Sequence, residues 1–86
     1  MIPISKAEDR AKDIEAYLQA TDPRFRRALN IVFDDGTSLL FQDAFIVEWK
    51  EYYLIFTEHH RFHVYHKDDV LHFQQYNRIY EVERVE

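Results

Sequence analysis

Histidine is the residue type in this sequence best suited to chemistry, and all five copies fall between positions 59 and 72. A structural zinc site takes about four ligands, a catalytic site about three plus a water, and both accept imidazole and carboxylate groups. The segment also contains carboxylates that could complete such a site. The candidate donors are Glu58, His59, His60, His63, His66, Asp68, Asp69 and His72.

The spacing of these histidines does not favour a metal centre. Successive side chains on a strand alternate between faces, so His63 and His66 point in opposite directions. His59 and His63 would share a face only across a short, regular turn. We expect His59 and His60 at an exposed hairpin turn, and His63, His66 and His72 on the solvent side of a sheet. A divalent-metal site on His59, His63 and His66, or a pH-sensing cluster, remains as an alternative.

Catalytic groups of other kinds are sparse. Hydroxyl side chains are few, and none is flanked by the glycines of a nucleophile elbow. Phosphate-binding loops need several glycines, and the sequence has one. The carboxylate pairs Asp34-Asp35 and Asp68-Asp69 lie at predicted turns, where aspartate commonly forms local hydrogen bonds. We predict that the protein is not an enzyme and needs no cofactor.

Length and composition indicate a single folded domain over residues 1–86. The chain is 47% hydrophobic and 16% aromatic, without cysteine. It shows no apolar run long enough for a signal peptide or a membrane span, which predicts a cytoplasmic protein that does not bind membranes. A net charge of −5 without a basic stripe disfavours nucleic acid as a partner.

The pattern of residues 5–20 predicts a helix. Ser5 and Glu8 have the spacing of a capping box, and Thr21-Asp22-Pro23 ends the segment. Its apolar stripe is narrow and rich in alanine: Ala7, Ala11, Ile14, Tyr17 and Leu18. Such a stripe predicts a helix that lies across the edge or open end of a sheet and covers one side of it.

From position 24 onward the apolar period changes to two, as expected for strands. A strand at 29–33 leads into the Asp34-Asp35-Gly36 turn, and a long run at 38–49 is expected to bend at Gln42-Asp43. Further turns at 50–51, 59–61, 67–68 and 77–78 separate more strands. The predicted class is α+β: one N-terminal helix and an antiparallel meander of five to six strands over residues 24–86, forming a curved sheet or small barrel.

The sequence has more large aromatic rings than one face of a sheet can bury, because neighbours such as Tyr52 and Tyr53 must point to opposite faces. Tyrosine and tryptophan are also enriched at the energetic centres of interfaces. We therefore predict a partner-binding surface formed by Trp49, Tyr52, Tyr53, Phe62 and Tyr65. Residues 79–86 alternate apolar and charged side chains, which is typical of an edge strand.

The order of helix, strand, Asp-Gly turn, long bent strand and further strands resembles the Sm-like small barrels, which include bacterial Hfq with its N-terminal helix. The segment Val64-Tyr65-His66-Lys67 is similar to that family's tyrosine, lysine and histidine segment, with histidine and lysine exchanged. The family's second glycine is absent, and Phe41 lies in that region. The resemblance implies a ring that binds uridine- or adenine-rich RNA near Tyr65, His66 and Lys67.

Taken together, these patterns predict a small, acidic, non-enzymatic regulatory or interaction protein. It would bind a protein partner, or its own copies as a homo-oligomer, through exposed aromatic residues on a β-sheet. Inhibition of a larger machine is one form of such a role, by analogy of size and charge. The alternatives are an Sm-like RNA-binding ring and a histidine-based metal-binding protein.

Overall fold

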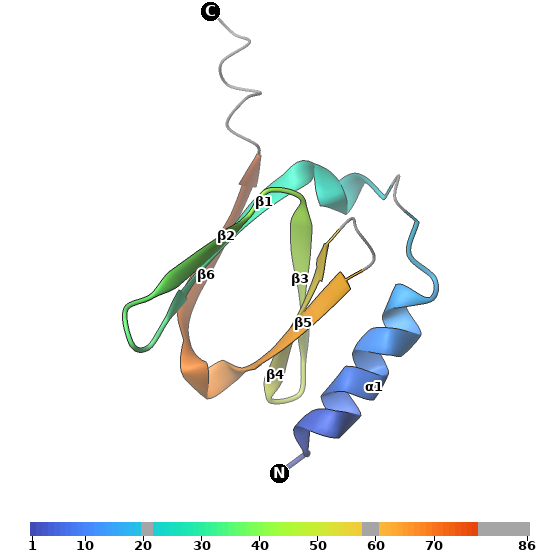
Figure 1. The fold of residues 1–86 in the computed structure, drawn as a ribbon, viewed down its shortest axis with the longest axis vertical. Coiled ribbons are helices and arrows are strands. Elements are labelled where there is room, and N and C mark those ends of the chain that lie inside the picture. The colour runs from blue at the N-terminus through green and yellow to red at the C-terminus, as the bar shows by residue number, and fades with distance from the viewer. Residues whose placement is uncertain (20–21, 58–60, 78–86) are drawn as a thin grey trace, which may run out of the picture.

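The computed structural model describes residues 1–19, 22–57 and 61–77 (Figure 1). Within them the chain forms one α-helix, six strands and two short 3-10 helices. In order these are α1 (Ile4–Glu15), η1 (Pro23–Arg26), β1 (Arg27–Phe33), β2 (Ser38–Phe41), β3 (Ala44–Trp49), β4 (Tyr52–Thr57), β5 (Arg61–His66), η2 (Lys67–Asp69) and β6 (Val70–Asn77).

The strands form two antiparallel three-stranded sheets. Sheet A has the order β2-β1-β6, and sheet B has the order β3-β4-β5. The long run at 38–49 divides at Gln42-Asp43 as predicted, and this bend carries the chain from one sheet to the other. The predicted meander is wrong at two places, since β2 does not pair with β3 and β6 pairs with β1 instead of β5. The two sheets do not close into a barrel.

The predicted tight turn after β1 is confirmed. Gly36 has a φ of +92°, a conformation that favours glycine, and its amide donates to the Phe33 carbonyl at 3.0 Å. The Asp35 carboxylate accepts from the Thr37 amide at 3.0 Å and from the Thr37 hydroxyl at 2.7 Å. These hydrogen bonds lower the pKa of the Asp35 carboxyl group.

The helix begins and ends earlier than predicted. Pro3 occupies the N-cap position without a side-chain hydrogen bond, and Ser5 lies inside the first turn, so the capping box is wrong. Pro3 has a φ of −67° and a ψ of 152°, which is the non-helical backbone expected of an N-cap residue. The helix ends at Glu15, where the chain tightens. The Tyr17 amide bonds the Ile14 carbonyl three residues back at 3.1 Å.

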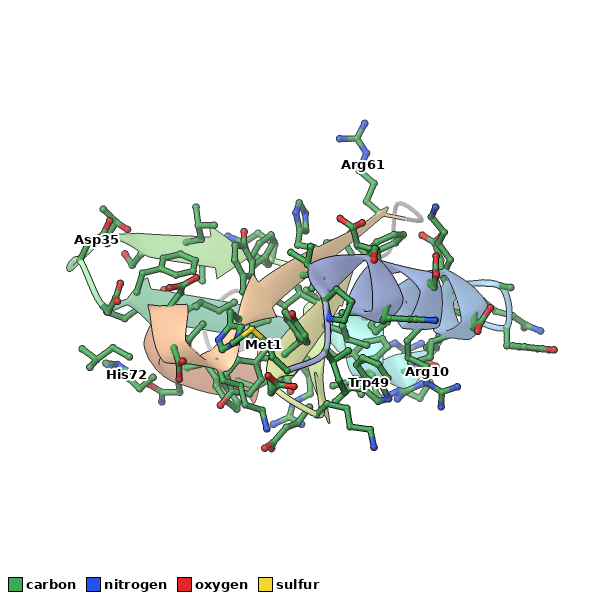
Figure 2. All side chains as sticks on the ribbon, turned by 90° about the horizontal axis from the view of Figure 1, so that it is seen from below. Met1, Arg10, Asp35, Trp49, Arg61 and His72 are labelled. Atoms are coloured by element: carbon green, nitrogen blue, oxygen red, sulfur yellow. The ribbon has the colours of Figure 1, made fainter. Side chains whose placement is uncertain are left out.

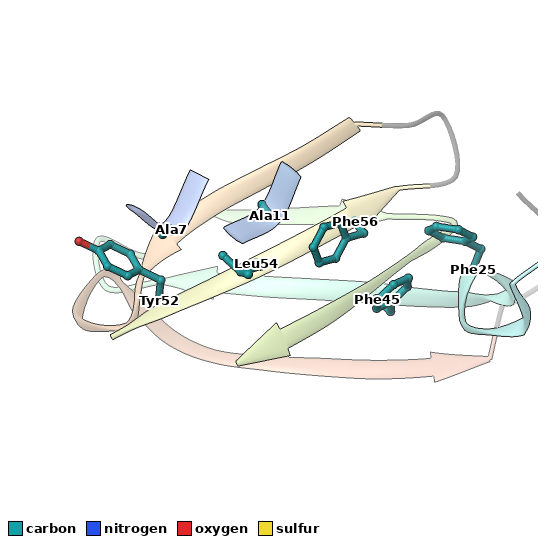
Figure 3. Packing of buried hydrophobic residues seen from close by; sticks show 7 residues of the cluster. All are labelled: Ala7, Ala11, Phe25, Phe45, Tyr52, Leu54 and Phe56. Atoms are coloured by element: carbon teal, nitrogen blue, oxygen red, sulfur yellow. The ribbon is translucent and has the colours of Figure 1, made fainter. Parts of the chain in front are cut away.

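α1 covers one side of sheet B, as predicted, and lies over its edge strand β5 and over β4. Ala7 and Ala11 are completely buried there, against Leu54 and Phe56 of β4 (Figure 3). Because alanine is small, the helix backbone can approach the sheet closely. The same cluster includes Phe25, Phe45 and Tyr52.

A second cluster fills the space between the sheets. Leu29 and Ile31 of β1 meet Ala44 and Ile55 of sheet B, and all four are buried. The Gln75 side chain also donates to the Ala44 carbonyl at 2.8 Å, which links β6 to β3. Sheet B is therefore covered on both faces.

Sheet A faces sheet B on one side only, and no described helix or strand forms a layer on its other face (Figure 1). The only longer helix of the described residues, α1, is also too polar and too short to cross a membrane. Because sheet B is covered on both faces and sheet A on only one, the uncovered face of sheet A remains accessible.

Candidate interaction surface

The five rings predicted to bind a partner do not form one exposed surface. Tyr52 is 3% exposed and its hydroxyl donates to the Ile2 carbonyl, so its predicted exposure is wrong. Trp49 and Phe62 are half-buried against the cluster beneath the helix. These three rings are covered because α1 occupies the face of sheet B to which they point.

The other two rings lie on the opposite face of sheet B. Tyr53 makes an edge-to-face contact with Phe73, with ring centroids 5.2 Å apart. Tyr65 packs on Phe33 at 5.0 Å, and burial raises the pKa of its hydroxyl. Both are half-buried. A partner-binding role for Trp49, Tyr53, Phe62 and Tyr65 remains a prediction.

The histidines of β5 point to opposite faces, as predicted. The His63 ring lies 5.3 Å from Phe41, and the His66 ring lies 5.2 Å from Tyr52. Their predicted place on the solvent side is wrong, since both are half-buried, while His72 is exposed as expected.

The residues that the structure describes contain no group of three or more histidine or acidic side chains that could hold a metal ion. His59, His60 and Glu58 lie outside the described residues, as does the predicted edge strand at 79–86. The metal-site alternative that includes His59 therefore remains a prediction.

Exposed large apolar side chains gather instead on the two edge strands of sheet A. Leu39 and Leu40 of β2 are 43% and 48% exposed, and Leu71 and Phe73 of β6 are 65% and 39% exposed. We call these four residues the apolar edges of sheet A. The remaining exposed large apolar residues of the described chain are Met1, Ile4 and Tyr17, away from this sheet.

The exposure of β2 has a signal in the sequence that apolar alternation alone does not show. Residues 37–42, Thr-Ser-Leu-Leu-Phe-Gln, carry no charge in a chain that is 31% charged. Adjacent leucines on a strand must point to opposite faces, so one of the two is exposed wherever only one face is covered. Charged residues are the usual guards of an edge strand, and β2 has none.

The backbone of β2 is also available along one side. β2 pairs with β1 in a register that places Leu39 opposite Ile31 and Phe41 opposite Leu29. The Phe33 amide donates to the Thr37 carbonyl at 2.8 Å, so Phe33 and Thr37 are a hydrogen-bonded pair of the ladder. In an antiparallel ladder every second residue bonds the neighbouring strand. Leu39 and Phe41 therefore bond β1, while Ser38 and Leu40 direct their amides and carbonyls outward.

A cavity of about 310 Å³ lies beside this outward edge. Phe41 and His63 pack ring against ring in its wall, and Arg61 is exposed at its rim and extends away from the body (Figure 2). The lining residues are Leu40, Phe41, Gln42, Asp43, Thr57, Arg61 and His63. An extended segment laid along β2 would find apolar contacts, a free ladder edge and a cationic group in one place.

No family model, curated protein or solved structure matches this chain. The segment that resembles the Sm-like proteins does not converge on one site. Tyr65 faces sheet A, His66 points to the opposite face of β5, and the Lys67 ammonium pairs with Glu48. Function must therefore be inferred from the geometry of sheet A, and above all from its β2 edge.

Proposed function

We propose that this chain is a non-enzymatic interaction protein that binds a protein partner, or a second copy of itself, along the β2 edge of sheet A. The observation that carries the proposal is the uncharged outer edge of β2, which no described strand pairs with and where Leu39 and Leu40 are both close to half exposed. The proposal keeps the predicted class of function and moves the contact surface from the rings of sheet B to the strands of sheet A.

Two physical arguments support this location. Leu39 and Leu40 expose apolar surface on both faces of the edge strand β2, so an extended partner strand laid beside β2 would contact both. A free strand edge adds directional hydrogen bonds to the apolar contact, and strand addition at a sheet edge is a recurring mode of recognition. Sheet B lacks a comparable face, because α1 and sheet A cover both of its sides.

A regulatory role, such as inhibition of a larger assembly, fits a small acidic chain that acts by contact alone. It rests on size and charge only.

The test compares Leu40→Lys with Tyr17→Lys. Leu40 lies on the edge of sheet A, while Tyr17 follows α1 and is 87% exposed, so both changes place a lysine on an exposed apolar position. The tagged chain and both variants are used to capture proteins from the native host, and the captured proteins are quantified. Loss of a partner with Leu40→Lys and its retention with Tyr17→Lys is the expected result. Retention of every partner by a folded Leu40→Lys variant would overturn the proposal.

A further inference from the structure

We infer that the partner at β2 is a second copy of this chain, and that the two β2 strands pair antiparallel about a twofold axis through Leu40. The inference rests on the proposed function and identifies its partner. The pair would join sheet A of both copies into one continuous sheet.

The hydrogen-bonding pattern of β2 suits its own copy. Opposite residues in an antiparallel ladder exchange hydrogen bonds only if both direct their amides and carbonyls toward each other. Ser38 and Leu40 direct theirs outward, as the register with β1 requires. A twofold axis through Leu40 places this residue opposite Leu40 of the second copy, so the two exchange both bonds. Ser38 then lies opposite Gln42 of the second copy.

The same register also brings apolar side chains of the two β2 strands opposite one another. Opposite residues of a ladder share a face. Leu40 meets its own symmetry mate on the face of sheet A that no described element covers. On the other face, Leu39 meets Phe41 of the second copy. Neither proline nor a charged residue interrupts β2, so nothing on this strand opposes the pairing.

The centre of the pairing brings no charged side chains together, because residues 37–42 carry no charge. Each chain has a net charge of −5, so two copies repel unless their contact avoids opposing acids. Pairing about Leu40 extends the Asp34-Asp35 turn of one copy past Gln42 of the other. That end of β2 borders the cavity that both Asp43 and the exposed Arg61 line. At each end of the uncharged centre, the acidic turn therefore approaches an arginine together with one aspartate.

A single-cysteine variant tests the register. The chain has no cysteine, so Leu40→Cys introduces the only thiol. The Cα atoms of a hydrogen-bonded antiparallel pair lie about 5.5 Å apart, within the roughly 4.4–6.8 Å that a disulfide spans. Leu71→Cys, on the other edge strand of sheet A, is the matched control. Under mild oxidation we expect a disulfide-linked dimer from Leu40→Cys and none from Leu71→Cys.

Sedimentation velocity over a concentration series provides the second measurement. The unmodified chain is expected to shift from the monomer to twice the monomer mass, and Leu40→Lys to remain monomeric, with circular dichroism confirming that it folds. A chain that stays monomeric throughout, or equal cross-linking of the two cysteine variants, would overturn the inference. If Leu40→Lys nevertheless loses a captured host protein, the proposed function stands and the second copy is replaced by another partner.

Discussion

Replacement of Ala11 by leucine tests how tightly α1 covers sheet B. Ala11 is completely buried where α1 packs on β4 and β5. Adding three heavy atoms to such a packed site costs about 1–3 kcal/mol through displaced side chains and backbone. Leucine and alanine differ little in helix propensity, so helix formation itself contributes only a small part of the change. We therefore expect Ala11→Leu to destabilise the fold by about 1–3 kcal/mol.

Urea denaturation followed by circular dichroism measures this change. In a domain of this size each kcal/mol also lowers the melting temperature by about 4–8 °C. Ala16→Leu is the control, because Ala16 is exposed at the end of α1 and its replacement should change stability by less than about 0.5 kcal/mol. If the helix lay loosely on the sheet, leucine would gain buried area and stabilise the protein. An Ala11→Leu variant at least as stable as the unmodified chain would refute the tight packing.

Three further substitutions test local features of the fold. Lys50→Gly should raise stability by up to about 1 kcal/mol in urea denaturation, because Lys50 holds a φ of +54° that glycine adopts without strain; a clear loss would contradict this. Tyr52→Phe removes the hydroxyl that donates to the Ile2 carbonyl and should cost about 0.5–1.5 kcal/mol, and an unchanged melting temperature would show that the bond contributes nothing. The Thr37 hydrogen bonds lower the pKa of Asp35 in the folded chain. They therefore stabilise the fold at pH values above the unfolded-state pKa of about 3.9, and this stabilisation is lost as the pH falls through the folded-state pKa. Asp35→Asn should therefore melt below the unmodified chain at neutral pH but alongside it in strong acid, and a gap that persists there would contradict the carboxylate's role.

The strands and turns of the fold could be predicted because their signals are local. Alternation of apolar residues identifies strands, and Asp35-Gly36 identifies the turn that follows β1. The division at Gln42-Asp43 could also be predicted from a run too long for one strand. The pairing of β1 with β6 could not, because it joins residues about forty positions apart, such as Ile31 and Phe73.

The contact surface was harder to predict, because burial depends on what covers each sheet. Tyr52 and Tyr53 point oppositely, as expected, yet Tyr52 is buried because α1 lies on one face of sheet B. Leu39 and Leu40 read as ordinary strand residues. Leu40 is exposed because it lies on the uncovered face of sheet A, and Leu39 is exposed because β2 is an edge strand. Which sheet the helix covers is a property of the packed molecule and has no local signature.

Amide hydrogen exchange of β2 tests the central claim, that its outward edge receives the partner, most directly. In the dilute chain the Leu39 and Phe41 amides should exchange slowly, because they bond β1, while the Ser38 and Leu40 amides exchange fast. With the partner bound, whether a second copy at high concentration or a captured host protein, the Leu40 amide should become slow. A Leu40 amide that is already as slow as Leu39 in the dilute chain, or that stays fast in the complex, would contradict the account.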